Sequence, residues 1–169
     1  MQANSHTTQT LRVKICGLTR REDAALAGEL GADALGFIFY RKSPRFIRPE
    51  QAAGIAEKVP RQVARVGVFA NPSVAEIEAV LAEVPLDVLQ LHGRHDFDLI
   101  DHFRQKTKIV CAFNISPDFD FAAFERYRET IDAFLLDGYK KGAYGGTGKV
   151  IDWQKAQAAK KYGPVILAG

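Results

Sequence analysis

The sequence predicts an alternating β/α fold built on a parallel sheet. Seven short and almost continuously apolar runs recur about every 26 residues, close to the ~30 residues of one strand–helix–strand unit. Segments of helical periodicity separate these runs. Several runs end in a polar or reactive residue, as at Cys16-Gly17 and Asp137-Gly138. Because the carboxyl ends of parallel strands share one face, such residues are expected to meet there.

Each run has the apolar character of a strand buried on both faces. The expected strands are Leu11–Cys16, Ala34–Phe39, Val63–Phe69, Asp87–Leu91, Ile109–Phe113, Ile131–Leu136 and Val165–Ala168.

The first helix is expected over Glu22–Leu30, where small and apolar residues form one face. Thr19 stands three residues before Glu22, the spacing of a capping box, and Gly31 is a typical helix stop. Pro49 suits the first position of the second helix.

The third helix is expected to follow the turn Asn71-Pro72-Ser73. Its apolar positions repeat with helical spacing at Val74, Ile77, Val80 and Leu81. The connection that contains Phe121, Phe124 and Tyr127 repeats this pattern and predicts a further helix.

The composition indicates one ordinary globular domain, with 47% hydrophobic and 25% charged residues in 169. We expect residues 1–10 to be a flexible leader and residues 11–169 to form a single β/α domain. No apolar stretch approaches the ~20 residues needed to cross a bilayer, so a cytoplasmic protein without a membrane partner is expected. A net charge of +3 with dispersed basic residues does not favour nucleic-acid binding. Cys16 and Cys111 are expected to be free thiols.

Two architectures fit the alternation: an open doubly wound sheet and a (β/α)₈ barrel. Even strand spacing favours the barrel, as does the lack of a glycine-rich dinucleotide fingerprint after the first strand. Seven strands cannot close a barrel whose geometry requires eight. Either the eighth strand and last helices are absent from this chain, or the sheet is open.

Cys16 and Asp137 are the candidate proton-transfer groups at the strand ends. Cys16 is either a small buried residue or, at a ligand-facing strand end, a general base. Asp137 follows an apolar run, so burial should raise its pKa and favour the acid form; the alternative is a carboxylate that caps the next loop. A paired acid and base can catalyse an isomerisation without a metal.

Three further residues are candidates for substrate binding. Arg45 lies in a basic loop, and its planar guanidinium matches a carboxylate or phosphate, although a solvated loop is the alternative. His92 could donate to a substrate or satisfy a backbone carbonyl. Gly169 ends the last strand, where barrel enzymes often begin a phosphate site. The glycine-rich segment 141–149 lacks the Walker pattern and is expected to form a lid.

Together these blocks resemble the phosphoribosylanthranilate isomerase family, in order and at family-like spacing from about Leu11 to Gly169. The matching blocks are Val13-Lys14-Ile15-Cys16-Gly17-Leu18-Thr19, Gly36-Phe37-Ile38-Phe39-Tyr40, Lys42-Ser43-Pro44-Arg45, Val66-Gly67-Val68-Phe69, Leu89-Gln90-Leu91-His92-Gly93, Leu135-Leu136-Asp137 and Gly145-Gly146-Thr147-Gly148-Lys149.

The resemblance implies a (β/α)₈ enzyme of tryptophan biosynthesis that needs no cofactor or metal. It would convert N-(5-phosphoribosyl)anthranilate to 1-(2-carboxyphenylamino)-1-deoxyribulose 5-phosphate by an Amadori rearrangement. By the same resemblance Asp137 is the general acid and Cys16 the general base. Arg45 holds the anthranilate carboxylate, His92 lies beside the site, and Gly169 begins the phosphate-binding turn.

Members of the family continue past this point to an eighth strand and a serine- and glycine-rich turn, so we expect a barrel that is incomplete at its C-terminus. The expected partner is a small phosphosugar, and the chain is expected to be a monomer or homodimer. Two alternatives remain open. One is a non-catalytic phosphosugar-binding relative, and the other is a barrel enzyme such as a ribulose-phosphate epimerase. The second is disfavoured because the sequence lacks a His/Asp cluster at metal-ligand spacing.

Overall fold

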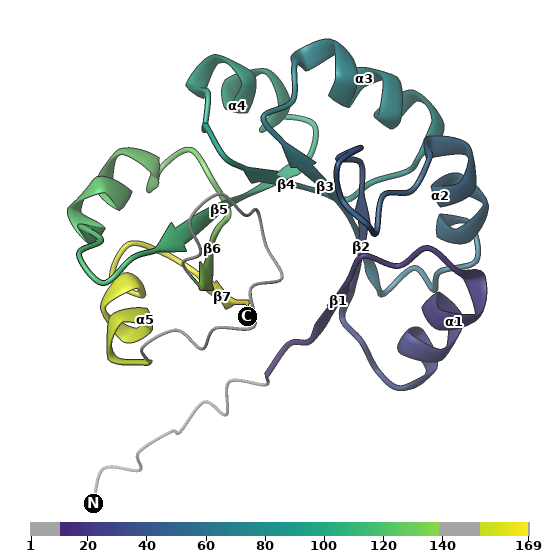
Figure 1. The fold of residues 1–169 in the computed structure, drawn as a ribbon, viewed down its shortest axis with the longest axis horizontal. Helices are drawn as coiled ribbons and strands as arrows, with labels where there is room; N and C mark the ends of the chain where they lie inside the picture. Colours follow the sequence, from purple (N-terminus) through teal and green to yellow (C-terminus); the bar gives the residue numbers. More distant parts are fainter. Residues whose placement is uncertain (1–10, 139–152, 169) are drawn as a thin grey trace, which may run out of the picture.

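The computed structural model describes residues 11–138 and 153–168, which form one curled parallel sheet with helices on its outer side (Figure 1). The strands are β1 (Lys14–Cys16), β2 (Ala34–Ile38), β3 (Ala64–Ala70), β4 (Val88–His92), β5 (Lys108–Ile115), β6 (Ala133–Gly138) and β7 (Val165–Leu167). The helices are α1 (Arg21–Glu29), α2 (Pro49–Ala56), α3 (Val74–Glu83), α4 (Phe97–Phe103), the 3₁₀ helix η1 (Phe121–Tyr127) and α5 (Trp153–Ala159).

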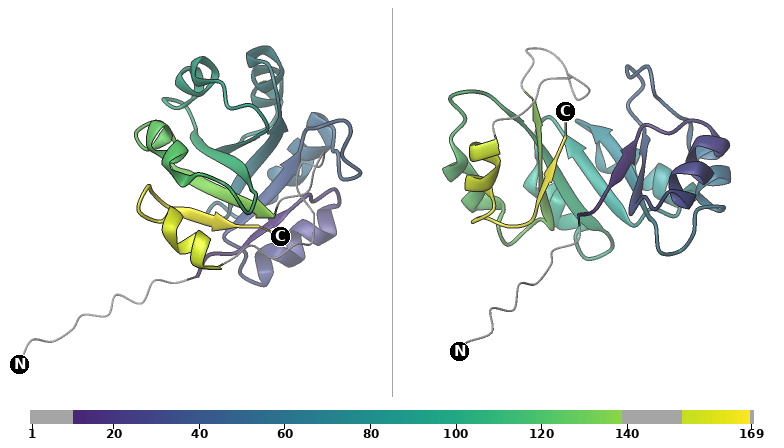
Figure 2. Two further views of the ribbon diagram at one scale, coloured as in Figure 1. Left: turned by 60° about the vertical axis from the view of Figure 1, so that its left-hand side comes forward. Right: turned by 90° about the horizontal axis from the view of Figure 1, so that it is seen from below.

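The strand order decides between the two predicted architectures. The seven strands pair in sequence order, β1-β2-β3-β4-β5-β6-β7, and every pair is parallel. In a doubly wound sheet the order of the strands reverses at a switch point, and helices cover both faces of the sheet. Both views in Figure 2 show the helices on the outer side alone. The arrangement is therefore that of a (β/α) barrel, with β1 and β7 as the two edges of the curl in the described residues.

The two faces of the sheet bury different apolar clusters. The outer face packs on the helices and holds the main core, which includes Leu35, Phe37, Leu89 and Ile109. The inner, concave face holds two smaller clusters, one centred on β2 and β3 and the other on β5 and β6. Both faces of this sheet are therefore apolar. Because successive residues of a strand point to opposite faces, each strand is a continuous apolar run in the sequence.

Aspartates connect the strands in pairs at their amino-terminal ends. Asp33, Asp87 and Asp132 each come directly before an even-numbered strand. Their Oδ2 atoms accept the backbone N–H groups of Val13, Arg65 and Ile109 at 2.7, 2.8 and 2.7 Å, and their own N–H groups donate to the carbonyls of those same residues. Each of these aspartate clamps thus fixes the start of one strand to the preceding strand by two hydrogen bonds. Arg65 adds a salt bridge to Asp87 at 2.8 Å.

Most predicted helix boundaries are confirmed. Pro49 is the first residue of α2, and Ser73 caps α3 through a full capping box with Glu76. The predicted cap at Thr19 is wrong. Helix α1 begins at Arg21, so Arg20 is its N-cap and Glu22 stands one position too early to reach back to the N-cap. The aromatic segment Phe121–Tyr127 is a 3₁₀ helix rather than an α-helix.

Among the described residues, no helix combines the length and the apolar character that crossing a bilayer requires.

Candidate active site

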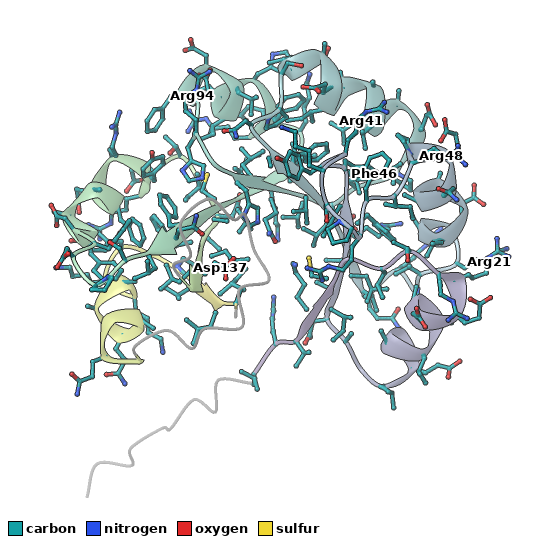
Figure 3. The ribbon with its side chains drawn as sticks, in the orientation of Figure 1. Arg21, Arg41, Phe46, Arg48, Arg94 and Asp137 are labelled. Atoms are coloured by element: carbon teal, nitrogen blue, oxygen red, sulfur yellow. The ribbon has the colours of Figure 1, made fainter. Side chains whose placement is uncertain are left out.

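The carboxyl ends of the strands bring Cys16 and Asp137 to the same face of the sheet. Asp137 follows Leu135 by two positions, and Leu135 belongs to the inner cluster of β5 and β6. Cys16 packs against the inner cluster of β2 and β3. Each lies at the end of its strand, so both side chains are on the concave face at its carboxyl-terminal mouth. Figure 3 shows Asp137 on the β6 side of this central region.

The Asp137 carboxyl group is buried without a full set of hydrogen bonds. Asp137 is only 2% exposed, and its Oδ1 has no hydrogen-bond partner in the part of the chain that the structure describes. Burial raises the pKa of this carboxyl, and a hydrogen bond to the Gly138 backbone opposes the shift only partly. The direction predicted from the sequence is confirmed. The acid form, which can donate a proton, therefore persists to a higher pH than in an exposed aspartate.

Cys16 has a half-buried, unpaired thiol. Its partner in the β1–β2 ladder is Gly36, and a Cβ atom at Gly36 would lie 2.9 Å from the Cys16 Sγ. A side chain at Gly36 would therefore displace the sulfur. The second cysteine, Cys111, is also unpaired but fully buried in the outer core, where burial raises the pKa of its thiol to about 12. Of the two thiols, only Cys16 faces the mouth.

Arg45 reaches the end of β1 from its loop. Its Nη1 donates to the carbonyl oxygen of Cys16 at 2.8 Å. The side chain crosses Gly17, where a Cβ atom would lie 2.7 Å from the Arg45 Cδ. The other arginines of the loop lie elsewhere: Arg41 stacks over Phe46 at 5.8 Å, and Figure 3 shows Arg41 and Arg48 on the side of α2 and α3. The basic loop therefore places one guanidinium, that of Arg45, beside Cys16.

His92 is buried at the end of β4 and has a partner that the sequence analysis missed. The Nε2 atom of His92 lies 2.6 Å from the amide Nε2 of Gln90, a residue two positions earlier on the same strand. Burial, followed by the nearby charges of Lys14 and His95, lowers the pKa of His92 to about 4. The ring is therefore neutral near pH 7. Neither predicted role, donation to a substrate or to a backbone carbonyl, included this side-chain partner.

Comparison with known proteins identifies the fold and the family. The sequence profile described as "N-(5'phosphoribosyl)anthranilate (PRA) isomerase" matches residues 13–169. N-(5'-phosphoribosyl)anthranilate isomerase from Geobacter metallireducens is 43% identical over 159 residues, covering 94% of this chain and 77% of that protein. The chain belongs to the phosphoribosylanthranilate isomerase family.

Solved structures of the phosphoribosylanthranilate isomerase family have the same fold. The structure of phosphoribosyl anthranilate isomerase from Thermotoga maritima is 38% identical and superposes with a TM-score of 0.85, covering 95% of this chain and 77% of that one. A second structure, of the isomerase in complex with reduced 1-(o-carboxyphenylamino)-1-deoxyribulose 5-phosphate, is 35% identical with a TM-score of 0.80. It covers 94% of this chain and 75% of that chain.

Two of the sequence predictions concern residues outside the described ones. Gly169, the predicted start of the phosphate-binding turn, is one, and the predicted lid at 141–149 is another. Within residues 11–138 and 153–168, no group of three or more His, Cys, Asp or Glu side chains is placed to hold a metal ion.

Lys14 is a second inner-face residue that the sequence analysis missed. It precedes Cys16 by two positions on β1, and its Nζ would lie 3.3 Å from a Cβ atom on Gly36. An inner-face lysine in this phosphoribosylanthranilate isomerase family member could have been expected from strand alternation alone, because positions 14 and 16 must share a face.

Proposed function

We propose that this chain catalyses the Amadori rearrangement of N-(5-phosphoribosyl)anthranilate to 1-(2-carboxyphenylamino)-1-deoxyribulose 5-phosphate, a step of tryptophan biosynthesis. The observation that carries the proposal is the buried Asp137 carboxyl, which has an unpartnered oxygen on the same concave face as the Cys16 thiol, within the part of the chain that is described. The related structure that holds a reduced form of this product supports the choice of substrate.

Asp137 acts first, as the general acid. It donates its proton to the ring oxygen of the ribose while the bond between that oxygen and C1′ breaks and its electron pair goes to the oxygen. The lone pair of the anthranilate nitrogen forms a C=N bond to C1′ and leaves an iminium cation. The raised pKa of Asp137 suits this step, because it extends the pH range over which the carboxyl holds the proton that it donates.

Cys16 acts second, as the general base. Its thiolate removes the proton from C2′, and the electron pair of that C–H bond forms a C1′=C2′ double bond while the iminium nitrogen recovers its lone pair. The product is a neutral enolamine, which tautomerises to the ketone. The positive iminium makes the C2′ proton acidic, so a base as weak as a thiolate is sufficient.

Substrate binding is assigned to residues around this pair. Arg45 offers the anthranilate carboxylate a planar pair of N–H donors beside Cys16. His92 lies at the end of β4 on the same inner face and contributes a neutral ring. Gly169 is proposed to begin the turn that binds the phosphate.

The decisive experiment measures product formation by the fluorescence of its anthraniloyl group, starting from freshly prepared substrate. The wild-type chain should turn over, and Cys16→Ser should lower kcat by about 100-fold, because a hydroxyl is a far weaker base than a thiolate. Cys111→Ala is the matched control and should keep the wild-type kcat, since Cys111 lies in the outer core.

Binding of the reduced product analogue by a wild-type chain that forms no product would instead favour the non-catalytic phosphosugar-binding protein. Unchanged kcat in Cys16→Ser would refute the role of Cys16 as the base. The cytoplasmic location and the monomeric or homodimeric state stay predictions.

Gly17→Ala tests the role of Arg45. Gly17 has φ of +81°, and a Cβ atom there would overlap the Arg45 side chain, so the alanine both strains the turn and displaces the guanidinium. We expect KM to rise roughly tenfold, because that is the effect of losing one charge-assisted hydrogen bond to the substrate. The change in kcat should be smaller. Gly31→Ala also replaces a positive-φ glycine but has no neighbour within 4 Å of the added Cβ, so it should leave KM unchanged. Equal KM values in both variants would argue against carboxylate binding by Arg45.

A further inference from the structure

Gln90 is a buried polar residue in the middle of an apolar strand. It is 3% exposed, and its ladder neighbours on the inner face are Val68 on β3 and Val110 on β5. Its amide nitrogen lies 2.6 Å from His92 Nε2, whereas its Oε1 has no hydrogen-bond partner among the described residues. Burying a primary amide among valines is costly unless its polar atoms are hydrogen-bonded, so an amide with an unpartnered oxygen calls for an explanation.

The direction of the contact between Gln90 and His92 determines where the imidazole proton lies. With the Gln90 amide nitrogen turned toward the ring, the amide is the donor, and the Nε2 atom that faces it is the unprotonated, accepting nitrogen. The single proton of a neutral ring is then on Nδ1. A protonated ring has no acceptor nitrogen, so the same contact disfavours the imidazolium form of His92.

We propose that Gln90 is a positioning residue that holds His92 as the neutral tautomer protonated on Nδ1. Because Gln90 occupies Nε2, the Nδ1–H is the ring's donor for the bound substrate. This inference rests on the proposed function, which puts His92 beside the reacting sugar.

Keeping His92 uncharged matters because the rearrangement passes through an iminium cation. Two titratable groups act on the ring through their charge, Lys14 on β1 and His95 in the loop after β4. Cys16 and Asp137 lie on the same concave face of the sheet. A second cation at His92, in addition to the Lys14 ammonium, would repel the intermediate. A neutral imidazole that donates a hydrogen bond can orient the substrate without that repulsion.

The first test is the tautomer itself, measured by ¹⁵N–¹H NMR of the imidazole rings in the full chain, with His92→Ala used to assign the signals. We expect the His92 proton on Nδ1 across the neutral range. A proton on Nε2 would overturn the inference, whether or not the chain has the proposed activity.

The second test uses the pH dependence of turnover in two variants. In Gln90→Glu, a carboxylate faces Nε2 and stabilises the imidazolium, so kcat should show a new fall on the acid side as His92 becomes charged. Gln90→Met removes the amide without adding charge. It should lower kcat roughly tenfold, as loss of one hydrogen bond predicts, and should produce no new acid limb. A purely structural role for Gln90 would give both variants the same pH profile.

A double-mutant cycle shows whether Gln90 acts through His92. In a His92→Ala background, Gln90→Met should cause no further loss of kcat, because the group it positions is gone. A further tenfold loss in that background would contradict the inference. If either Gln90 variant fails to fold, the NMR measurement on the wild-type chain decides alone. Absence of turnover in the wild type would count against the proposed function, and the tautomer would still be measurable.

Discussion

Asp137→Asn is expected to lower kcat by roughly 10³-fold, in the middle of the range for general acid–base catalysis. The effect should exceed that of Cys16→Ser, because proton donation to the ring oxygen must occur before any cation exists to help. An asparagine fits the same space but cannot supply the proton. The fluorescence assay measures this directly, and Asp23→Asn in the exposed first turn of α1 is the matched control, expected to keep the wild-type kcat.

The same substitution should become more stabilising, relative to wild type, as the pH increases. The folded-state pKa of Asp137 is raised by burial, so the folded chain binds this proton more tightly than the unfolded chain does. Wild-type stability therefore falls as the pH rises from the unfolded-state pKa of Asp137 through its folded-state pKa. Above the folded-state pKa the loss of stability stays constant. The asparagine side chain of the variant has no such titration. The difference in Tm between Asp137→Asn and wild type should become more favourable to the variant as the pH rises from below the unfolded pKa of an aspartate, ~3.9, to above the raised folded pKa.

A difference in Tm that does not vary with pH would show that Asp137 titrates alike in both states, contrary to its burial. Wild-type kcat should fall as the pH rises through the raised pKa of Asp137, because only the acid form donates. A rate that instead rose through this range would assign the residue the role of a base.

Phe124→Ala is expected to destabilise the fold by about 3–5 kcal/mol, the usual loss when a buried phenylalanine becomes alanine. Phe124 is 0% exposed and lies between η1 and the outer face of the sheet. Its ring stacks on Phe134 with centroids 4.3 Å apart and contacts Phe113 at 4.6 Å. Removing it opens a cavity in the centre of an aromatic cluster.

Urea unfolding measures this loss. Phe121→Ala is the matched comparison on the same 3₁₀ helix. Phe121 is half-buried and meets Phe124 edge-on with ring centroids 5.4 Å apart, so its replacement should lower the free energy of unfolding by less than half as much. If Phe124→Ala does not fold, Phe124→Leu should fold and show a loss of unfolding free energy smaller than the one expected for the alanine variant. Similar losses for positions 121 and 124 would mean that the cluster is not centred on Phe124.

Local patterns in the sequence predicted much of this fold, because strand burial and helix capping depend on neighbouring residues. Pro49 and Ser73 mark their helices correctly for that reason. Thr19 does not, since a shift of one residue at the start of α1 removes the capping geometry. The burial of Asp137 followed from the apolar run before it.

The inner-face partners were harder to find because they depend on which positions of each strand face inward. Gln90 and His92 are two positions apart on β4, so alternation alone puts both side chains on one face, but the single run does not tell which face of the strand is concave. Cys16 and Cys111 look alike in sequence, and only the curl of the sheet separates the thiol at the mouth from the one in the outer core. Such distinctions come from the register between strands, which no single run contains.

The aspartate clamps divide the sheet into three two-stranded modules, β1–β2, β3–β4 and β5–β6. Each clamp joins residues only 20 to 23 positions apart, so each module can form locally and early, before distant strands meet. Between modules, Asp33 and Asp87 accept from Ala64 and Lys108 through backbone carbonyls at 2.9 and 3.3 Å. The ladders across these seams are not shorter, since β2–β3 and β4–β5 each pair five residues whereas β1–β2 pairs three. The clamps therefore distinguish the modules at their strand starts, where each adds a carboxylate hydrogen bond.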